Sequence, residues 1–144
     1  ASLHSLVIPS SVTCIGDYAF EGCSSLVDIS LPSSLEAIEE KAFARCSSLQ
    51  KLSIPNSVKS IGKNAFRGCT ALTELIIPPS ITSIEVATFE DCSALEKITL
   101  PSTVNEIQAD AFRGCTALKS LAIPSSVESV DNLGIENSVQ VTRF

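Results

Sequence analysis

A phenylalanine recurs every 23 residues along this chain, and that period constrains the fold more than any other feature of the sequence. Proline and cysteine recur with the same period. A period of this length is typical of stacked repeats, in which each unit buries its apolar side only against its neighbours. The recurring residues are Phe20, Phe43, Phe66, Phe89 and Phe112; Pro9, Pro32, Pro55, Pro78, Pro101 and Pro124; and Cys23, Cys46, Cys69, Cys92 and Cys115.

Each repeat predicts two short extended segments and one tight turn. In the second repeat, Ile29 and Leu31 alternate with polar residues, which is the period-two pattern of a half-buried strand. Pro32 ends that strand because proline cannot donate to a sheet ladder, and a second extended piece follows over residues 35–38. Residues 42–46 predict one helical or 3₁₀ turn, since positions three and four apart share a helix face.

Six such units predict an α/β repeat solenoid, a single domain with a parallel sheet on one face. Rungs about 4.8 Å apart make the stack about 30 Å long. Residues 134–138 replace the usual Ala, Phe and Cys, which predicts either a degenerate terminal cap or a decayed copy. We expect Val141 at the position of Leu26 and Phe144 at that of Ile29. The predicted units are 3–25, 26–48, 49–71, 72–94, 95–117 and 118–140, with a degenerate end over 134–144.

Two recurring phrases resemble a known repeat family. They are Leu26-x-x-Ile29-x-Leu31-Pro32 and Ala42-Phe43-x-x-Cys46, and copies of them cover nearly the whole chain. They resemble the BspA-like class of leucine-rich repeats. The resemblance implies a right-handed leucine-rich repeat stack. It also implies a secreted or surface-exposed adhesion protein of a host-associated bacterium or a parasitic protist, but no partner-specific motif comes with it.

Charge and hydropathy argue against two classes of partner. The chain carries 10 Lys and Arg against 16 Asp and Glu, a net charge of −6. Nucleic-acid binding needs clustered positive charge, and an anionic membrane surface also attracts basic segments. No apolar run approaches the ~20 residues of a spanning helix, so we expect neither nucleic-acid binding nor membrane insertion. The chain opens at Ala1 without a signal peptide, so we expect a mature product or a segment of a longer array.

The periodic cysteines have a structural and a chemical interpretation. A metal ladder or redox relay would need converging ligand pairs such as Cys-x-x-Cys, which the sequence lacks. Disulfides between rungs would need side chains that point toward each other, whereas repeated positions run parallel. We therefore predict small buried hydrophobes beside the phenylalanines. Cys14 stands outside the series at a mostly polar repeat position, so we expect it to be exposed and the most reactive thiol.

The outward side of the first strand in each repeat is the candidate partner-binding face. One repeat position alternates in charge, and the position two residues later is small or apolar, with Ile76 as the exposed apolar residue to watch. Opposite charges on neighbouring strands also avoid like-charge clashes, so the row has a purely structural interpretation as well. The candidate residues are Asp28, Ser30, Lys51, Ser53, Glu74, Ile76, Lys97 and Thr99.

Catalysis has little support in the sequence. The only histidine, His4, lies in the first repeat and offers no triad, and the glycines occupy repeat turns instead of a phosphate-binding loop. We expect no enzyme and no cofactor. The sequence favours a non-catalytic adhesion or interaction module, secreted or on the cell surface, that binds a protein or glycan through the strand face. The alternative is a structural subunit of a larger assembly, in end-to-end contact with further repeats or another subunit.

Overall fold

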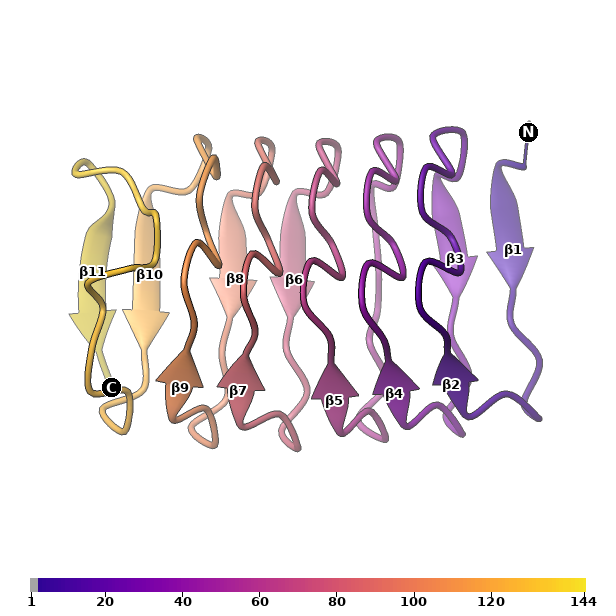
Figure 1. Ribbon diagram of the computed structural model, residues 1–144, viewed down its shortest axis with the longest axis horizontal. Helices are drawn as coiled ribbons and strands as arrows, with labels where there is room; N and C mark the ends of the chain where they lie inside the picture. Colours follow the sequence, from indigo (N-terminus) through magenta and orange to yellow (C-terminus); the bar gives the residue numbers. More distant parts are fainter. Residues whose placement is uncertain (1–2) are drawn as a thin grey trace.

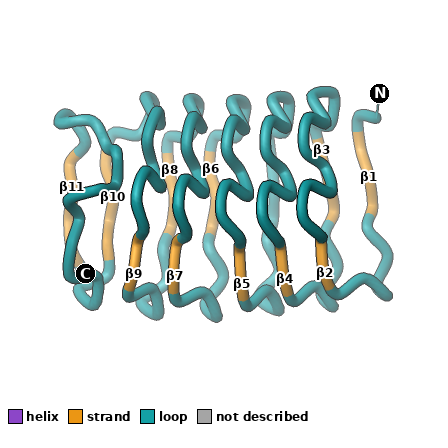
Figure 2. Tube along the Cα trace, in the orientation of Figure 1, coloured by secondary structure: helices purple, strands orange, loops and turns teal. Residues whose placement is uncertain are grey.

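The chain forms a stack of six rungs and a closing strand, as the computed structural model in Figure 1 shows. The structure describes residues 3–144, so the opening Ala1 and Ser2 lie outside the described part. Each rung runs along one side of the stack, turns, and returns along the other (Figure 2). The strands are β1 (Ser5–Val7), β2 (Cys14–Ile15), β3 (Asp28–Ser30), β4 (Ala37–Ile38), β5 (Ser60–Ile61), β6 (Glu74–Ile76), β7 (Ser83–Ile84), β8 (Lys97–Thr99), β9 (Glu106–Ile107), β10 (Ser120–Ile123) and β11 (Gln140–Arg143).

The strands lie in two rows of parallel neighbours, which confirms the predicted solenoid. In one row, β1 pairs with β3, β6 with β8, and β10 with β11. In the other row, β2 pairs with β4, β4 with β5, and β7 with β9. The register steps by one repeat, so that Ser5 lies opposite Asp28 and Cys14 opposite Ala37. The predicted second extended segment therefore forms a sheet row of its own.

Residues 42–46 form consecutive turns, so the predicted helical or 3₁₀ turn is wrong. The Ala44 amide donates to the Lys41 carbonyl within the rung (3.1 Å), whereas the Phe43 amide donates to the Ala65 carbonyl of the next rung (2.8 Å). Backbone amides therefore alternate between acceptors in their own rung and acceptors in the next rung. In a helix, all of these amides would donate to carbonyls of the same segment. Lys41 and Arg45 adopt left-handed backbone angles, with φ of 55° and 61°, which break any helix.

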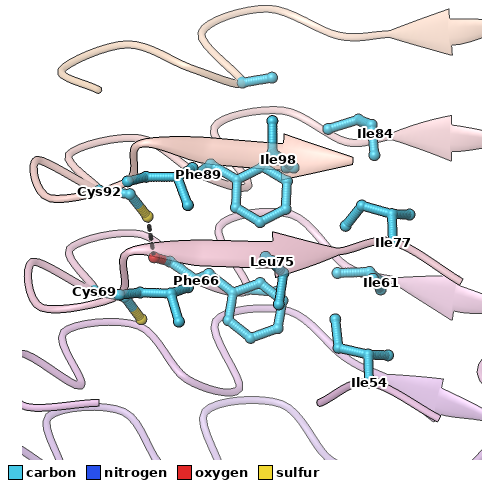
Figure 3. Packing of buried hydrophobic residues seen from close by; sticks show 14 of the residues in the cluster. Ile54, Ile61, Phe66, Cys69, Leu75, Ile77, Ile84, Phe89, Cys92 and Ile98 are labelled. Atoms are coloured by element: carbon cyan, nitrogen blue, oxygen red, sulfur yellow. Dashed lines mark hydrogen bonds between the residues drawn. The ribbon is translucent and has the colours of Figure 1, made fainter. Parts of the chain in front are cut away.

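A column of phenylalanine rings forms the centre of the core, as predicted (Figure 3). Phe43, Phe66, Phe89 and Phe112 are fully buried. Successive rings stack nearly parallel, with centroids 5.6 Å apart between Phe43 and Phe66 and 5.8 Å between Phe66 and Phe89. Leucine and isoleucine columns from both strand rows pack around these rings. Each rung therefore buries its apolar side against its neighbours.

The last turn of the solenoid is three residues shorter than the others. Ser120 pairs with Gln140, a step of 20, where Ser5 pairs with Asp28, a step of 23. Val141 accordingly lies opposite Leu121, at the position of Ile29, and the expected placement of Val141 and Phe144 is wrong. The shortening falls in the degenerate segment. Gly134 lies against Arg113, 21 residues earlier, whereas Gly114 lies against Asp91, 23 residues earlier.

Within both strand rows, backbone hydrogen bonding from rung to rung is interrupted at the junction of rungs 49–71 and 72–94, which we call the central junction. The amides of Val27, Gln50 and Glu96 occupy one repeat position, and each donates to a carbonyl one rung back, over 2.8, 3.2 and 2.8 Å. Within residues 3–144, the equivalent amide of Thr73 makes no such bond. In the second row, the amides of Lys59 and Asn105 occupy one repeat position and donate to the carbonyls of Glu36 and Thr82, one rung back. The equivalent amide of Thr82 makes no such bond within the described residues.

The turn side of the stack stays continuous across the same junction. The Asn64 amide donates to the Val86 carbonyl and the Phe66 amide to the Thr88 carbonyl, both over 3.0 Å. The central junction is therefore held by its turns and its core, and not by its strand ladders. The junction between the fifth and sixth rungs lacks the corresponding strand bonds of Lys119 and Glu128 within the described residues.

Candidate interaction site

The strand face is the outward side of the row that contains β1, β3, β6, β8 and β10. Strand geometry creates it, because successive side chains point to opposite sides. In β3, Ile29 is buried while its neighbours Asp28 and Ser30 are exposed, and β6 and β8 repeat this pattern. The eight predicted residues all lie exposed on this face: Asp28, Ser30, Lys51, Ser53, Glu74, Ile76, Lys97 and Thr99.

A hollow of about 330 Å³ lies on the strand face between β8 and β10, and two further shallow hollows lie one on each side of the third rung. The larger, about 660 Å³, is lined by residues of β3 and the third rung and reaches Glu74. The smaller, about 430 Å³, lies at the central junction, between Leu52 and Ile54 of the third rung and Ile76 of β6. Every one of the eight predicted residues lines at least one of these hollows. The sequence did not predict the hollows.

The charges of the strand face form two neighbouring pairs and not one continuous ladder. Asp28 lies opposite Lys51 through a single bridge, and Glu74 lies opposite Lys97 in the β6–β8 ladder. The predicted alternating row is interrupted between Lys51 and Glu74, where the central junction lacks strand bonds. Opposite charges placed as direct neighbours on adjacent strands stabilise the sheet only modestly, by ~0.2–1 kcal/mol per pair.

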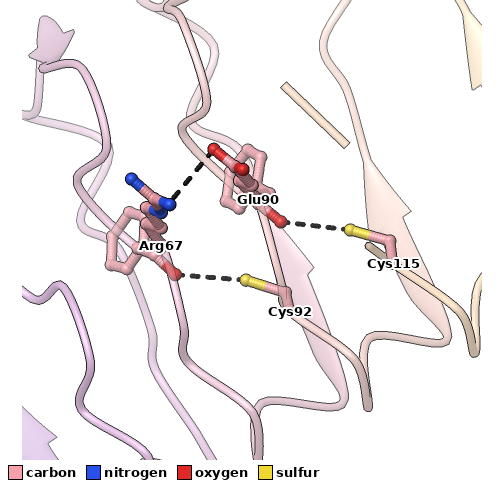
Figure 4. A network of polar contacts seen from close by, with 6 residues as sticks. Arg67, Glu90, Cys92 and Cys115 are labelled. Carbon is pink, nitrogen blue, oxygen red and sulfur yellow. Dashed lines mark hydrogen bonds and ion pairs between the residues drawn. The ribbon is translucent and has the colours of Figure 1, made fainter. Parts of the chain in front are cut away.

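None of these four charges makes an ion pair within the part of the chain that the structure describes. The ion pairs in residues 3–144 lie elsewhere, between Lys59 and Glu36 (3.3 Å) and between Arg67 and Glu90 (3.6 Å; Figure 4). The strand-face charges are therefore exposed and free of competing partners in the chain.

Apolar side chains lie on the strand face at one repeat position. Ile76 exposes 70% of its surface and Val7 exposes 75%, and Ala122 at the same position is also exposed. The predicted exposure of Ile76 is confirmed. Of these residues, Ile76 borders the hollow at the central junction, whereas Val7 belongs to the first rung. Ala122 also lines a hollow, between β8 and β10, so Ile76 is the large apolar side chain among them that combines exposure with a neighbouring depression.

The cysteine column is buried, as predicted, except at Cys23, which is half-buried in the first rung, and it also has an arrangement that the sequence did not indicate. Each interior thiol donates a hydrogen bond to the phenylalanine carbonyl of the preceding rung (Figures 3 and 4). All six cysteines are free thiols. The bonds are Cys46 to Phe20 (3.2 Å), Cys69 to Phe43 (3.2 Å), Cys92 to Phe66 (3.1 Å) and Cys115 to Phe89 (3.1 Å).

Burial makes these thiols poor nucleophiles. It raises the pKa of Cys46 and of Cys115 to about 12, from an ordinary value of 9.0. It also raises the pKa of Cys69 and of Cys92 well above that value. Because the thiolate is the reactive form, the column is chemically inert at neutral pH.

Cys14 is exposed, as predicted, but its surroundings do not activate it. Its Sγ lies 3.5 Å from Oε1 of Glu39. Partial desolvation, the hydrogen bond to Glu39 and the negative charges of Glu39 and Asp17 all raise the pKa of the Cys14 thiol. Exposure, and not an activating neighbour, distinguishes Cys14 from the other cysteines.

Within residues 3–144, no three His, Cys, Asp or Glu side chains converge in a way that could hold a metal ion. None of the described segments forms a helix long and apolar enough to cross a bilayer. His4 is exposed in the first rung.

Comparisons with known proteins agree with the fold. The family model described as the BspA type leucine-rich repeat region matches residues 1–113 and 88–144, with six copies. A leucine-rich repeat protein from Bacteroides ovatus is 30% identical over 98% of this chain and 42% of its own, with a TM-score of 0.78. The leucine-rich repeat protein of T. pallidum is 33% identical over 81% of this chain and 65% of its own, with a TM-score of 0.65.

A third solved structure adds a cellular context for a relative. A leucine-rich cell surface protein from Faecalibacterium prausnitzii is 25% identical over 96% of this chain and 60% of its own, with a TM-score of 0.56. The chain therefore spans only part of each of these proteins. A search of curated proteins finds no match.

None of the three solved structures is described as an enzyme, and the repeats indicate a protein-interaction or surface-type module. The family model covers essentially the whole chain, and the rungs, the two parallel strand rows and the phenylalanine column all match a leucine-rich repeat solenoid. The chain belongs to the BspA-type leucine-rich repeat family.

Proposed function

We propose that this chain is a non-catalytic adhesion or interaction module that binds a partner protein through its strand face. The observation that carries the proposal is the row of four exposed charges on both sides of Ile76, none of them in an ion pair within residues 3–144, which line the two hollows beside the third rung. An exposed apolar side chain beside a depression, surrounded by polar groups, is the usual anatomy of a binding site. The solenoid also supplies the extended surface that repeat proteins use.

The proposed location is extracellular or on the cell surface. It is supported by the F. prausnitzii relative, which is a cell surface protein, and by family membership. A glycan partner would use the same face. The exposed Ile76 beside a hollow with charged residues at its edge favours a protein, because protein interfaces pair an apolar centre with a polar rim.

A second candidate function is a structural subunit within a larger assembly. The observation that favours it is at the two ends of the stack, where Leu3 is 44% exposed and Phe144 is 53% exposed. The edge strands β1 and β11 also present backbone groups that further repeats or another subunit would cover. In that case the ends, and not the strand face, would carry the contact.

Charge reversal tests the strand face against the ends. Lys51→Glu together with Lys97→Glu changes the strand face, and Lys63→Glu is the matched control because Lys63 is exposed beside the second strand row. Each protein would serve as bait in extracts of the source organism and of its host, with bound proteins and glycans identified by mass spectrometry. We expect the strand-face variant to lose a protein that the wild type and Lys63→Glu retain. Equal retention by all three baits would overturn the proposal and favour the ends.

A further inference from the structure

We propose that the partner segment that binds the strand face is an amphipathic α-helix lying across the strands, along the axis of the stack. This inference rests on the proposed function and specifies its partner. It predicts two Lys–Glu pairs on the helix, each with i, i+3 spacing, and one apolar residue between them. Three observations carry it: the spacing of the charges, their order, and the position of the hollow.

The spacing of the charged pairs fits a helix better than an extended peptide. Asp28 and Lys51 are direct neighbours on adjacent parallel strands, as are Glu74 and Lys97, so each pair is about 4.8 Å apart. Residues i and i+3 of a helix share a face and are about 4.5 Å apart along the axis. Same-face residues of an extended strand, i and i+2, are about 6.6 Å apart and miss each pair by about 2 Å.

The two charged pairs are also separated by a distance that a helix can match. Lys51 and Glu74 face each other across the central junction, where strand bonds are missing, so the step from the first pair to the second is no shorter than two rungs. Two rungs correspond to about 9.6 Å. A second helical pair that begins seven residues after the first is displaced by about 10.5 Å and stays on the same face.

The order of the charges fixes the register of such a helix. From the second rung to the fifth, the strand face reads negative, positive, negative, positive, through Asp28, Lys51, Glu74 and Lys97. A helix that presents Lys, Glu, Lys, Glu matches all four charges. A shift by one rung would place like charges opposite each other, which is repulsive. Because none of the four has an ion-pair partner in residues 3–144, no internal salt bridge must break.

The hollow at the central junction extends from the third rung to both charges of the second pair, Glu74 and Lys97, and it takes the apolar residue. Its walls include the apolar side chains of Leu52 and Ile54 from the third rung and Leu75 from β6, and Ile76 borders it. Its volume of about 430 Å³ accommodates one large aliphatic side chain together with part of the helix surface. An anchor of this type supplies most of the affinity of a small interface, while the charges supply specificity.

Three synthetic peptides of equal composition test the helix. The first is helical, with Lys, Glu, Lys and Glu at i, i+3, i+7 and i+10 and a central Leu. The second keeps the helix but groups the charges in the order Lys, Lys, Glu, Glu. The third keeps the order Lys, Glu, Lys, Glu but places these residues at i, i+2, i+4 and i+6, the same-face spacing of an extended strand. Fluorescence anisotropy at low ionic strength would measure binding to the full chain. We expect the first peptide to bind at least about tenfold more tightly than either control, a difference of about 1.4 kcal/mol.

The hollow provides a matched pair of protein variants. Ile76→Ser introduces the residue that other rungs already carry at Ser30 and Ser53, so the fold should tolerate it. Val7→Ser makes the same kind of change at an exposed position of the first rung, away from the hollow. We expect Ile76→Ser to weaken binding of the first peptide several-fold and Val7→Ser to leave it unchanged. Equal binding of the three peptides, or equal effects of the two variants, would overturn the inference.

The outcome separates this inference from the function on which it rests. If the Lys51→Glu and Lys97→Glu bait loses its natural partner but the helical peptide binds no better than its controls, the interaction module stands and the helical partner is rejected. If that bait keeps its partner, the strand face is not the binding site and both proposals fail.

Discussion

Cys92 donates its thiol hydrogen to the carbonyl oxygen of Phe66, 3.1 Å away and one rung back, and Cys46, Cys69 and Cys115 each make the corresponding bond. Hydrogen bonds from the cysteine thiols to the phenylalanine carbonyls therefore connect the two columns along the stack. Burial keeps each thiol protonated, because the surroundings exclude the water that would solvate a thiolate. This arrangement gives the buried cysteines a thermodynamic consequence at alkaline pH.

Stability should fall steeply above pH 9. Unfolded thiols ionise near their ordinary pKa of 9.0, whereas burial raises the pKa of Cys46 and Cys115 to about 12 in the fold. The protonated thiols favour the folded state, so their contribution is complete below pH 9 and is lost as the pH rises toward 12. The loss is up to about 1.4 kcal/mol per pH unit for each thiol. Urea unfolding in reducing buffer between pH 8 and 11 measures the slope.

Removal of one thiol should reduce that slope. Cys115→Ser keeps a small polar side chain that does not titrate in this range, so the free energy of unfolding should decrease less steeply with pH than in the wild type. Lysine and tyrosine ionisation is common to both proteins and cancels in the comparison. An identical slope in the two proteins would show that the buried thiols ionise in the fold as they do in water.

The phenylalanine column should be most sensitive at its centre. Phe66 is fully buried and stacks on Phe43 and on Phe89, so Phe66→Ala should cost about 3–5 kcal/mol of unfolding free energy. Phe20 lies at the start of the column, is only partly buried and stacks on one ring, so Phe20→Ala should cost clearly less. Denaturant unfolding of both variants makes the comparison. A cost for Phe66→Ala below about 1 kcal/mol would contradict a core role.

The repeat period explains why most of this fold could be predicted from the sequence. A 23-residue step aligns like residues in columns, so the buried phenylalanines and cysteines and the exposed strand face follow from alternation and stacking alone. The turn over residues 42–46 was assigned wrongly because helices and consecutive turns both bring residues three apart together. Left-handed angles at ordinary residues such as Lys41 and Ala87 carry no signal in the sequence.

The periodic pattern could not predict features that differ from one junction between rungs to the next. The 20-residue last turn follows from pairing of Ser120 with Gln140, which a fixed period cannot anticipate. The central junction likewise lacks strand bonds although the residues at Thr73 and Thr82 resemble those of other rungs. Because the hollows lie beside that junction, the eight candidate residues were predictable as exposed positions but not as the lining of a depression.

Two glycines at one repeat position should respond differently to the same substitution. A Cβ on Gly62 would lie 2.6 Å from the backbone nitrogen of Glu40 and 2.7 Å from the carbonyl carbon of Glu39, so Gly62→Ala must displace backbone. We expect a cost of about 1–3 kcal/mol, as for other overpacked sites. A Cβ on Gly16 meets no atom within 4 Å, so Gly16→Ala should be neutral or stabilising by about 0.4–1 kcal/mol. Thermal unfolding of the two variants would show equal shifts if close packing at Gly62 were unimportant.

Thiol labelling of the native protein should modify Cys14 first, and Glu39 should control the rate. The other thiols are wholly or partly covered, whereas Cys14 is exposed. Glu39→Gln removes a negative charge 3.5 Å from its Sγ, which lowers the pKa of Cys14 and increases the thiolate fraction. We expect faster labelling by a maleimide or an aromatic disulfide at pH 7.5. Glu36→Gln, on the neighbouring strand segment, is the control that should leave the rate unchanged; equal acceleration by both would attribute the effect to net charge.

The central junction should open more readily than the junctions whose strand bonds are complete, and the junction between the fifth and sixth rungs, which lacks the corresponding bonds, should behave like it. The Thr73 and Thr82 amides lack the strand bonds that Gln50, Glu96 and Asn105 make at equivalent repeat positions. Hydrogen exchange reports such differences residue by residue, because an amide without a bond is protected only by burial. We expect Thr73 and Thr82 to exchange within the earliest time points by NMR, and Gln50, Glu96 and Asn105 to remain protected.

The Phe66 amide, which bonds to Thr88 across the same junction, should exchange slowly as the internal control. Protection of Thr73 equal to that of Glu96 would show that the strand ladder closes in solution, whereas fast exchange at Phe66 as well would mean that the two halves of the solenoid separate completely.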